Sequence, residues 1–164
     1  MSRKTFAISA LAVITVAFAT TVVTIWSTQR AKGLRANCQQ NLHALDEALH
    51  IYLRDYGDYP PTIAAAIKTS DNSWSLAMCP ALGNQLDRSK LRIQSDYIYV
   101  YWKKNMRLAD WGKGHYPLVY DASFANHGDG INILFENGEV TWDENGQRIK
   151  KLASDHPELQ LPTK

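Results

Sequence analysis

The main helix of this chain is predicted from residues 34–61, which read LRANCQQNLHALDEALHIYLRDYGDYPP. Apolar side chains recur there at spacings of three and four, which predicts one apolar stripe along an amphipathic helix of about six turns. The stripe consists of Leu34, Cys38, Leu42, Leu45, Leu49, Tyr52, Leu53 and Tyr56. Gly57 and the Pro60-Pro61 pair predict the end of the helix, because proline has no backbone N–H to continue the hydrogen-bond ladder.

An uncharged apolar segment of 21 residues, Phe6–Trp26, precedes this helix. As a helix it would be about 32 Å long, close to the hydrocarbon thickness of a bilayer. Trp26 and the basic residues that follow it are typical of the interfacial end of a membrane-spanning helix. Proline is absent between residues 6 and 59, so one helix is expected to run from this segment to Tyr56, weakened only at Gly33.

The alternative for this segment is a cleaved secretory signal. Ala17-Phe18-Ala19 has the small residues of a cleavage site, and cleavage after Ala19 would release a module that begins at Thr20 and binds a ligand or calcium. An uncleaved anchor predicts residues 1–5 in the cytoplasm, a span at 6–26, a globular domain at 27–151 and a C-terminal tail at 152–164 with little regular structure. This arrangement places a single-pass protein in the inner (cytoplasmic) membrane, with its C-terminal domain in the periplasm or at the cell exterior.

Charge and composition limit the classes of function. Lys and Arg total 18 and Asp and Glu total 16, so the formal net charge is +2. Arg3 and Lys4 account for this excess, and the neutral remainder does not favour nucleic acid as a partner. One long apolar segment argues against a cytosolic soluble protein and against a multi-pass transporter.

The C-terminal half of the chain has the composition of β-strands. Aromatic and β-branched residues predict strands at 97–102, 116–120, 131–135 and 140–142. Asn137-Gly138 lies between the last two and predicts a hairpin turn in which both residues have positive φ, and Asn145-Gly146 predicts a further turn. A short helix capped by Thr62 is expected over residues 62–68. The fold class is therefore α+β, a long N-terminal helix packed on a small antiparallel sheet over about 97–142.

Three patches of this sequence resemble the type II secretion pseudopilins and type IV pilins. The first is the helix and its exit, from Asn41-Leu42 to Tyr59-Pro60, and the second is Cys79-Pro80 after a cysteine at the helix start. The third is His127 followed by nine residues and Asn137-Gly138, which is similar to the C-terminal His-x9-Asp-Gly hairpin motif of a pilin-like subgroup. The resemblance implies a pilin-like fold and a non-enzymatic structural or interaction role, possible partners being other pilin-like subunits or secretion-system components.

The chain departs from this family at its N-terminus. Thr5 stands where pilin precursors have the glycine cut by prepilin peptidase, and Phe6–Trp26 contains no glutamate. In pilins that buried glutamate is thought to pair with the N-terminus of a neighbouring subunit, which specifies assembly. The resemblance therefore implies an accessory of such a system more than a filament subunit.

Two sets of residues are candidates for binding or cross-linking. Cys38 and Cys79 could form a disulfide that stabilises the exported domain by roughly 4 kcal/mol, the alternative being two buried thiols. Asp121, Asn126 and Asp129 surround His127 in a glycine-rich turn, and such oxygen-rich loops bind calcium. The alternative favoured here is that Asp121 and His127 hydrogen-bond to the backbone and fix the turn, so that no metal and no cofactor is expected.

Two further patterns are weaker. His43, Glu47 and His50 share one helix face and could bind zinc, but a solvated polar face explains them better. A basic and aromatic stretch could bind nucleic acid or an acidic partner, but an exposed loop is the better interpretation. That stretch consists of Trp102, Lys103, Lys104, Arg107, Trp111, Lys113 and Tyr116. Sequence motifs of nucleotide-binding loops, zinc proteases and serine hydrolases are missing, so the sequence predicts no catalytic residues and a non-enzymatic protein.

Overall fold

The computed structural model describes residues 3–72, 74–81, 95–102, 112–157 and 159–163, with side chains from residue 15 onward except that of Ala125. The chain divides into two compact units, Met1–Gly33 and Leu34–Lys164. Helix α1, Arg3–Tyr56, contributes to both units, so the predicted continuous helix through Gly33 is confirmed. The helix ends at the predicted place, where Gly57 has a φ of 75° and its N–H donates to the Leu53 carbonyl.

The N-terminal unit contains part of the predicted membrane span. Over the residues for which the structure gives a description, none of the helices has the length and the hydropathy to cross a bilayer. The backbone of the predicted span, Phe6–Trp26, is described throughout, but its side chains are described only from Thr15 onward.

The C-terminal unit contains a four-stranded antiparallel sheet in the order β1-β2-β3-β4. Its strands are β1 (Tyr97–Tyr99), β2 (Pro117–Asp121), β3 (Gly130–Phe135) and β4 (Val140–Glu144). The other elements are α2 (Ile63–Thr69), α3 (Gln147–Asp155) and the 3-10 turns η1 (Trp74–Ala77) and η4 (Phe124–Asn126). This is an α+β fold, as predicted, and Thr62 caps α2 by accepting a hydrogen bond from the Ala65 N–H.

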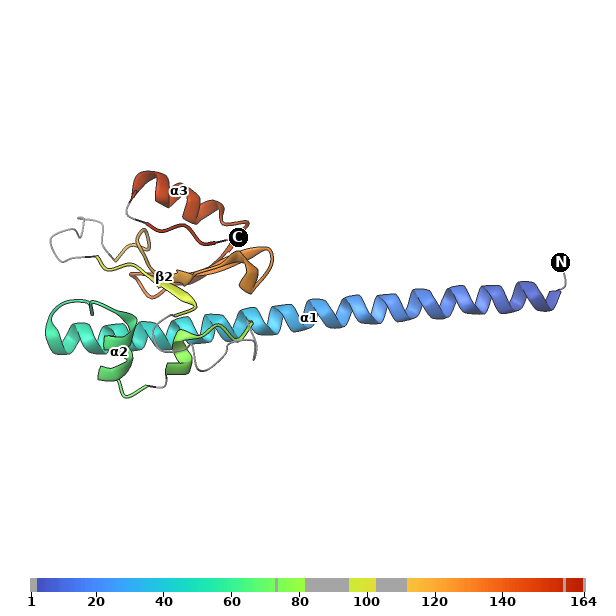
Figure 1. The fold of residues 1–164 in the computed structure, drawn as a ribbon, viewed down its shortest axis with the longest axis horizontal. Coiled ribbons are helices and arrows are strands. Elements are labelled where there is room, and N and C mark those ends of the chain that lie inside the picture. The colour runs from blue at the N-terminus through green and yellow to red at the C-terminus, as the bar shows by residue number, and fades with distance from the viewer. Residues whose placement is uncertain (1–2, 73, 82–94, 103–111, 158, 164) are drawn as a thin grey trace. The chain divides into compact units, whose positions relative to one another are not determined.

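Both faces of the sheet are covered, which explains why β2 and β3 are buried along their whole length. Figure 1 shows the sheet beside the second half of α1, with α3 on its opposite face. Leu134 packs in the same cluster as the buried stripe of α1 and the apolar residues of α2. Ile133 and Phe135 point the other way and pack with Ile149 of α3. The period of two along β3 therefore sends alternate side chains into two apolar clusters, one on each face of the sheet.

The predicted apolar stripe of α1 is buried over only part of its length. Cys38, Leu42, Leu45 and Leu49 are at most 1% exposed, so this part of the stripe is confirmed. Tyr56 is 64% exposed, contrary to the prediction, because the helix ends there and the ring stacks on Tyr52 at 4.3 Å.

The hairpin between β3 and β4 forms where it was predicted, but with a different turn. Gly138 has a φ of 82°, whereas Asn137 is not among the residues with positive φ, so this is not the expected two-residue turn. The Gly138 N–H donates to the Phe135 carbonyl at 2.9 Å, which makes a longer loop with glycine in the left-handed position. The second predicted turn, Asn145-Gly146 after β4, instead has positive φ at both residues and leads into α3.

The predicted boundary between domain and tail at residue 152 is not a structural boundary. Helix α3 runs through it to Asp155, and Ile149 of that helix is fully buried. Beyond the helix, the Tyr120 hydroxyl donates to the Gln160 carbonyl, and Thr163 forms a parallel bridge with Ser123. The C-terminal residues are thus part of the domain, because they bond to Tyr120 of β2 and to Ser123, just before η4.

Candidate metal centre

Four buried side chains that could bind a metal meet on the α1 face of the sheet. They are Cys38 of α1, Cys79 after η1, Asp121 at the end of β2 and His127 after η4, here called the Cys–Asp–His cluster. One ligand atom from each lies within 4.8 Å of all the others. Cys38 and Asp121 are fully buried, Cys79 is 3% exposed and the His127 side chain is 2% exposed.

Local structure explains how each side chain reaches the cluster. Cys38 belongs to the buried stripe of α1, and the N–H of Cys79 donates to Asp96 Oδ2 at 2.8 Å. Asp121 ends β2, and its Oδ2 accepts from the backbone N–H of Asn132 on the neighbouring strand at 2.7 Å. His127 follows η4, where its N–H donates to the Phe124 carbonyl.

The imidazole of His127 is the centre of the short contacts. Its Nε2 lies 3.6 Å from Cys79 Sγ, 3.5 Å from Asp121 Oδ2 and 3.3 Å from Asn132 Nδ2. Which of the two nitrogens donates in the contact with Asn132 depends on the tautomer of His127. A ring nitrogen of histidine that is directed at a carboxylate and a thiol is also placed to bind a metal shared with them.

The two thiols influence each other's proton affinity. A hydrogen bond from Cys79 stabilises the thiolate of Cys38 and lowers the pKa of Cys38. The pKa of Cys79 is raised for the same reason, because it donates to Cys38 and lies beside its charge. The first proton therefore leaves the pair easily, and the resulting thiolate is a good ligand for a soft or borderline metal ion.

Asp121 has an uncompensated oxygen. Burial raises the pKa of this carboxyl to about 7. Among the described residues, its Oδ1 has no hydrogen-bond partner, and neither does Oδ1 of Asn132. Buried polar atoms are nearly always paired, so an orphaned carboxylate oxygen beside two sulfurs and an imidazole calls for a cation.

The predicted disulfide stays a prediction. The structure brings Cys38 and Cys79 together and gives both as free, buried thiols. The sequence pointed to the cysteines and to Asp121 and His127 as two separate features, and the fold combines them. Asn132 was missed, although a polar residue in the middle of an apolar strand was a signal for it.

The residues proposed for calcium have different neighbours. Asp129 is exposed and forms an ion pair with Arg35 at 3.1 Å, and the guanidinium of Arg35 also lies over the Trp142 ring. Asn126 is buried, whereas Asp121 belongs to the Cys–Asp–His cluster. The carboxylates of Asp121 and Asp129 therefore have different partners: Asp121 lies with Cys38, Cys79 and His127, and Asp129 pairs with Arg35.

The three helix residues for which a solvated polar face was preferred over a zinc site lie on an open face of α1. His43, Glu47 and His50 are all exposed. His50 Nδ1 lies 3.2 Å from Asp46 Oδ1 and 2.9 Å from the Asp46 carbonyl oxygen. The His50 ring therefore already has a partner on α1, one turn earlier.

This contact predicts a basic histidine. The hydrogen bond to Asp46 raises the pKa of His50 from 6.5 to about 9. Because the pKa of His50 is higher in the folded protein, its protonation stabilises the folded state fully below pH 6.5, and this stabilisation is lost as the pH rises through about 9. The His50 ring is half exposed, so the contribution to the free energy of unfolding is under about 1 kcal/mol. NMR titration of the ring should show this midpoint, and Asp46→Asn should move it back towards 6.5. An unchanged midpoint in that variant would contradict the assignment.

Much of the basic and aromatic stretch lies outside the described residues, which omit 103–111. Its two ends are ordered in the core, where Trp102 Nε1 donates to the Pro117 carbonyl and the Trp102 ring contacts Tyr116 edge-on. These two aromatic rings pack in the core, so a surface for stacking bases would have to come from other residues.

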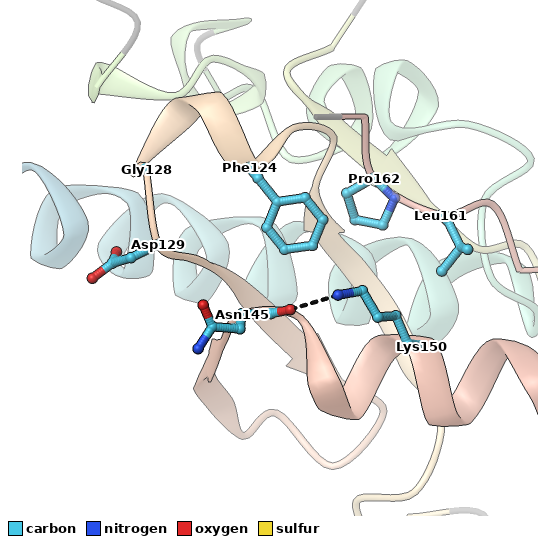
Figure 2. A pocket seen from close by; sticks show the side chains of 7 residues that line it. All are labelled: Phe124, Gly128, Asp129, Asn145, Lys150, Leu161 and Pro162. Carbon is cyan, nitrogen blue, oxygen red and sulfur yellow. Dashed lines mark hydrogen bonds between the residues drawn. The ribbon is translucent and has the colours of Figure 1, made fainter.

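A pocket of about 570 Å³ opens beside η4 and α3 (Figure 2). Its walls are Phe124, Gly128, Asp129, Asn145, Lys150, Leu161 and Pro162. Lys150 Nζ donates to the Asn145 carbonyl at 2.8 Å, and Asp129 is paired with Arg35. The charged groups of this pocket already have partners, so the Cys–Asp–His cluster is the stronger candidate site.

No protein-family model, curated protein or solved structure matches this chain.

Proposed function

We propose that this protein is a non-enzymatic, membrane-anchored protein of pilin-like architecture, with a structural or interaction role. In this proposal Phe6–Trp26 anchors the chain and the unit from Leu34 to Lys164 is the exported domain. An accessory role in a type II secretion or type IV pilus-like system is the part of the proposal that rests on the sequence resemblance.

The observation that supports the anchor is the apolar surface of α1 in the N-terminal unit. Large apolar side chains between residues 16 and 26 are 48–70% exposed, namely Val16, Phe18, Val22, Val23, Ile25 and Trp26. Soluble proteins rarely leave so continuous an apolar surface in water. A lipid environment would cover it without any protein partner.

The hydroxyl groups of this helix support the same proposal. Every Ser and Thr from residue 20 to residue 28 donates its hydroxyl to a backbone carbonyl three or four residues earlier. Thr24, for example, donates to the carbonyls of Thr20 and Thr21. Polar groups satisfied within their own helix remain compatible with lipid, where water cannot compensate them.

Membrane extraction tests this proposal. We expect the full chain, produced in a bacterial host, to remain in the membrane pellet after alkaline carbonate washing and to have the mass of the uncleaved sequence. Val22→Arg places a charge in the span, where it costs about 2.5–3.5 kcal/mol, and should shift the protein towards the soluble fraction. Gln40→Arg is the matched control, because Gln40 is exposed but lies outside the span.

Two results would contradict the anchor. One is recovery of the wild-type chain in the soluble cytosolic fraction. The other is a soluble exported product that begins at Thr20, which would show cleavage after Ala19 and turn attention to a secreted binding module.

A further inference from the structure

We propose that the Cys–Asp–His cluster binds one Zn²⁺ per chain as a closed, four-coordinate structural site. The site joins α1 to the sheet, since Cys38 lies on the helix and Asp121 on β2. This inference is independent of the membrane anchor, because the cluster lies wholly within the unit from Leu34 to Lys164.

The spacing of the ligand atoms fits tetrahedral zinc. Bonds of about 2.0–2.3 Å to nitrogen, oxygen and sulfur place neighbouring ligands of a tetrahedron roughly 3.3–3.8 Å apart. Cys79 Sγ and His127 Nε2 are 3.6 Å apart, and His127 Nε2 and Asp121 Oδ2 are 3.5 Å apart. These three ligand atoms therefore lie close to the separations that the ion requires, and all four lie within 4.8 Å of one another.

A divalent ion would also compensate the charge that metal binding creates in the cluster. Zinc takes the place of the thiol protons, and the resulting two thiolates and carboxylate would be a large uncompensated charge in a fully buried place without the ion. A disulfide would neutralise the sulfurs, but it would leave Asp121 Oδ1 without a partner. A cation among the four ligands compensates the sulfurs and the carboxylate together.

The ligand types select the metal. Thiolate and imidazole favour zinc and disfavour calcium and magnesium, which take oxygen ligands. Four protein ligands leave no open position for water or substrate, which is typical of structural zinc sites. The outer contacts fit as well, since Asn132 donates to Asp121 Oδ2 through its backbone and its side chain, as partners of metal ligands commonly do.

Metal titration of the full chain in detergent tests the proposal. After reduction and removal of metal by a chelator, zinc is titrated in competition with a chromophoric chelator. We expect one Zn²⁺ per chain, a higher Tm with zinc, and thiolate-to-cobalt absorption when Co²⁺ replaces zinc. Cys38→Ser and Asp121→Asn should each weaken zinc binding at least tenfold. The double variant His43→Gln, His50→Gln removes two exposed imidazoles of α1 and should bind zinc like the wild type.

A wild-type measurement keeps the test valid if a cluster variant fails to fold. Zinc should protect both cysteines of the reduced wild-type chain from alkylation, as counted by intact mass. Alkylation at the same rate with and without zinc would overturn the proposal, and so would unchanged binding in a folded Cys38→Ser variant. A chain isolated without reductant that is lighter by two hydrogens would also overturn it, because the sulfurs would then form the predicted disulfide.

Discussion

Replacing Glu136 by alanine is expected to lower the free energy of unfolding by about 3–5 kcal/mol. The carboxylate of Glu136 is 4% exposed and accepts three backbone hydrogen bonds. The N–H groups of Gly114 and His115 donate to Oε1 at 2.9 and 3.0 Å, and that of Tyr116 donates to Oε2 at 2.8 Å. Alanine would leave these three donors without their acceptor, two of them in buried hydrogen bonds and the third, from His115, in a part-buried one.

Chemical denaturation of matched variants measures this effect. Glu136→Gln keeps one oxygen but presents an NH₂ group to a backbone donor, so an intermediate loss of about 1–3 kcal/mol is expected. Glu139→Ala in the same hairpin is the control, because that side chain is exposed, and it should change stability by less than about 0.5 kcal/mol. If the two alanine variants were equally stable, Glu136 would not hold the segment before β2.

Replacing Leu45 by alanine is expected to cost about 2–5 kcal/mol, from lost apolar contact and from the cavity that remains. The Leu45 side chain is fully buried, at 0% exposure. It packs in the apolar cluster that contains residues of α1, α2 and the sheet. The neighbouring elements of this close-packed layer can relax only in part, so most of the cavity should persist.

Thermal or urea unfolding of the reduced, metal-free chain checks this second prediction. Glu47→Ala, two residues along the same helix and exposed, is the control and should change stability little, because alanine and glutamate are both good helix formers. A loss for Leu45→Ala no larger than for the control would mean that the packing of α1 on the sheet contributes little to stability.

The local elements of this fold could be predicted from the sequence because they follow short-range rules. The three-and-four spacing over Leu34–Leu53, the Thr62 cap and the strand composition each depend on residues a few positions apart. Strands β2, β3 and β4 and helix α2 were therefore found within a few residues of their observed bounds. Helix α3 was missed, because its nine residues are mostly polar and only Ile149 is fully buried.

The turn at Asn137-Gly138 shows where a local rule was insufficient. The glycine was needed for its positive φ, as predicted, but the asparagine was not. The same loop begins with Glu136, whose carboxylate accepts hydrogen bonds from the chain before β2, a long-range contact that the local turn rule does not include. No spacing in the sequence connects Glu136 with Gly114.

By itself the sequence determined the long helix, the positions of the strands and the apolar character of the segment before Leu34, because backbone geometry and side-chain period are local properties. Only the tertiary structure decided that Cys38 and Cys79 share a site with Asp121 and His127. These four residues come from separate elements spread over 90 positions of the chain, from 38 to 127. Their meeting depends on how α1 packs on the sheet, and that packing is the sum of many apolar contacts that no single motif encodes.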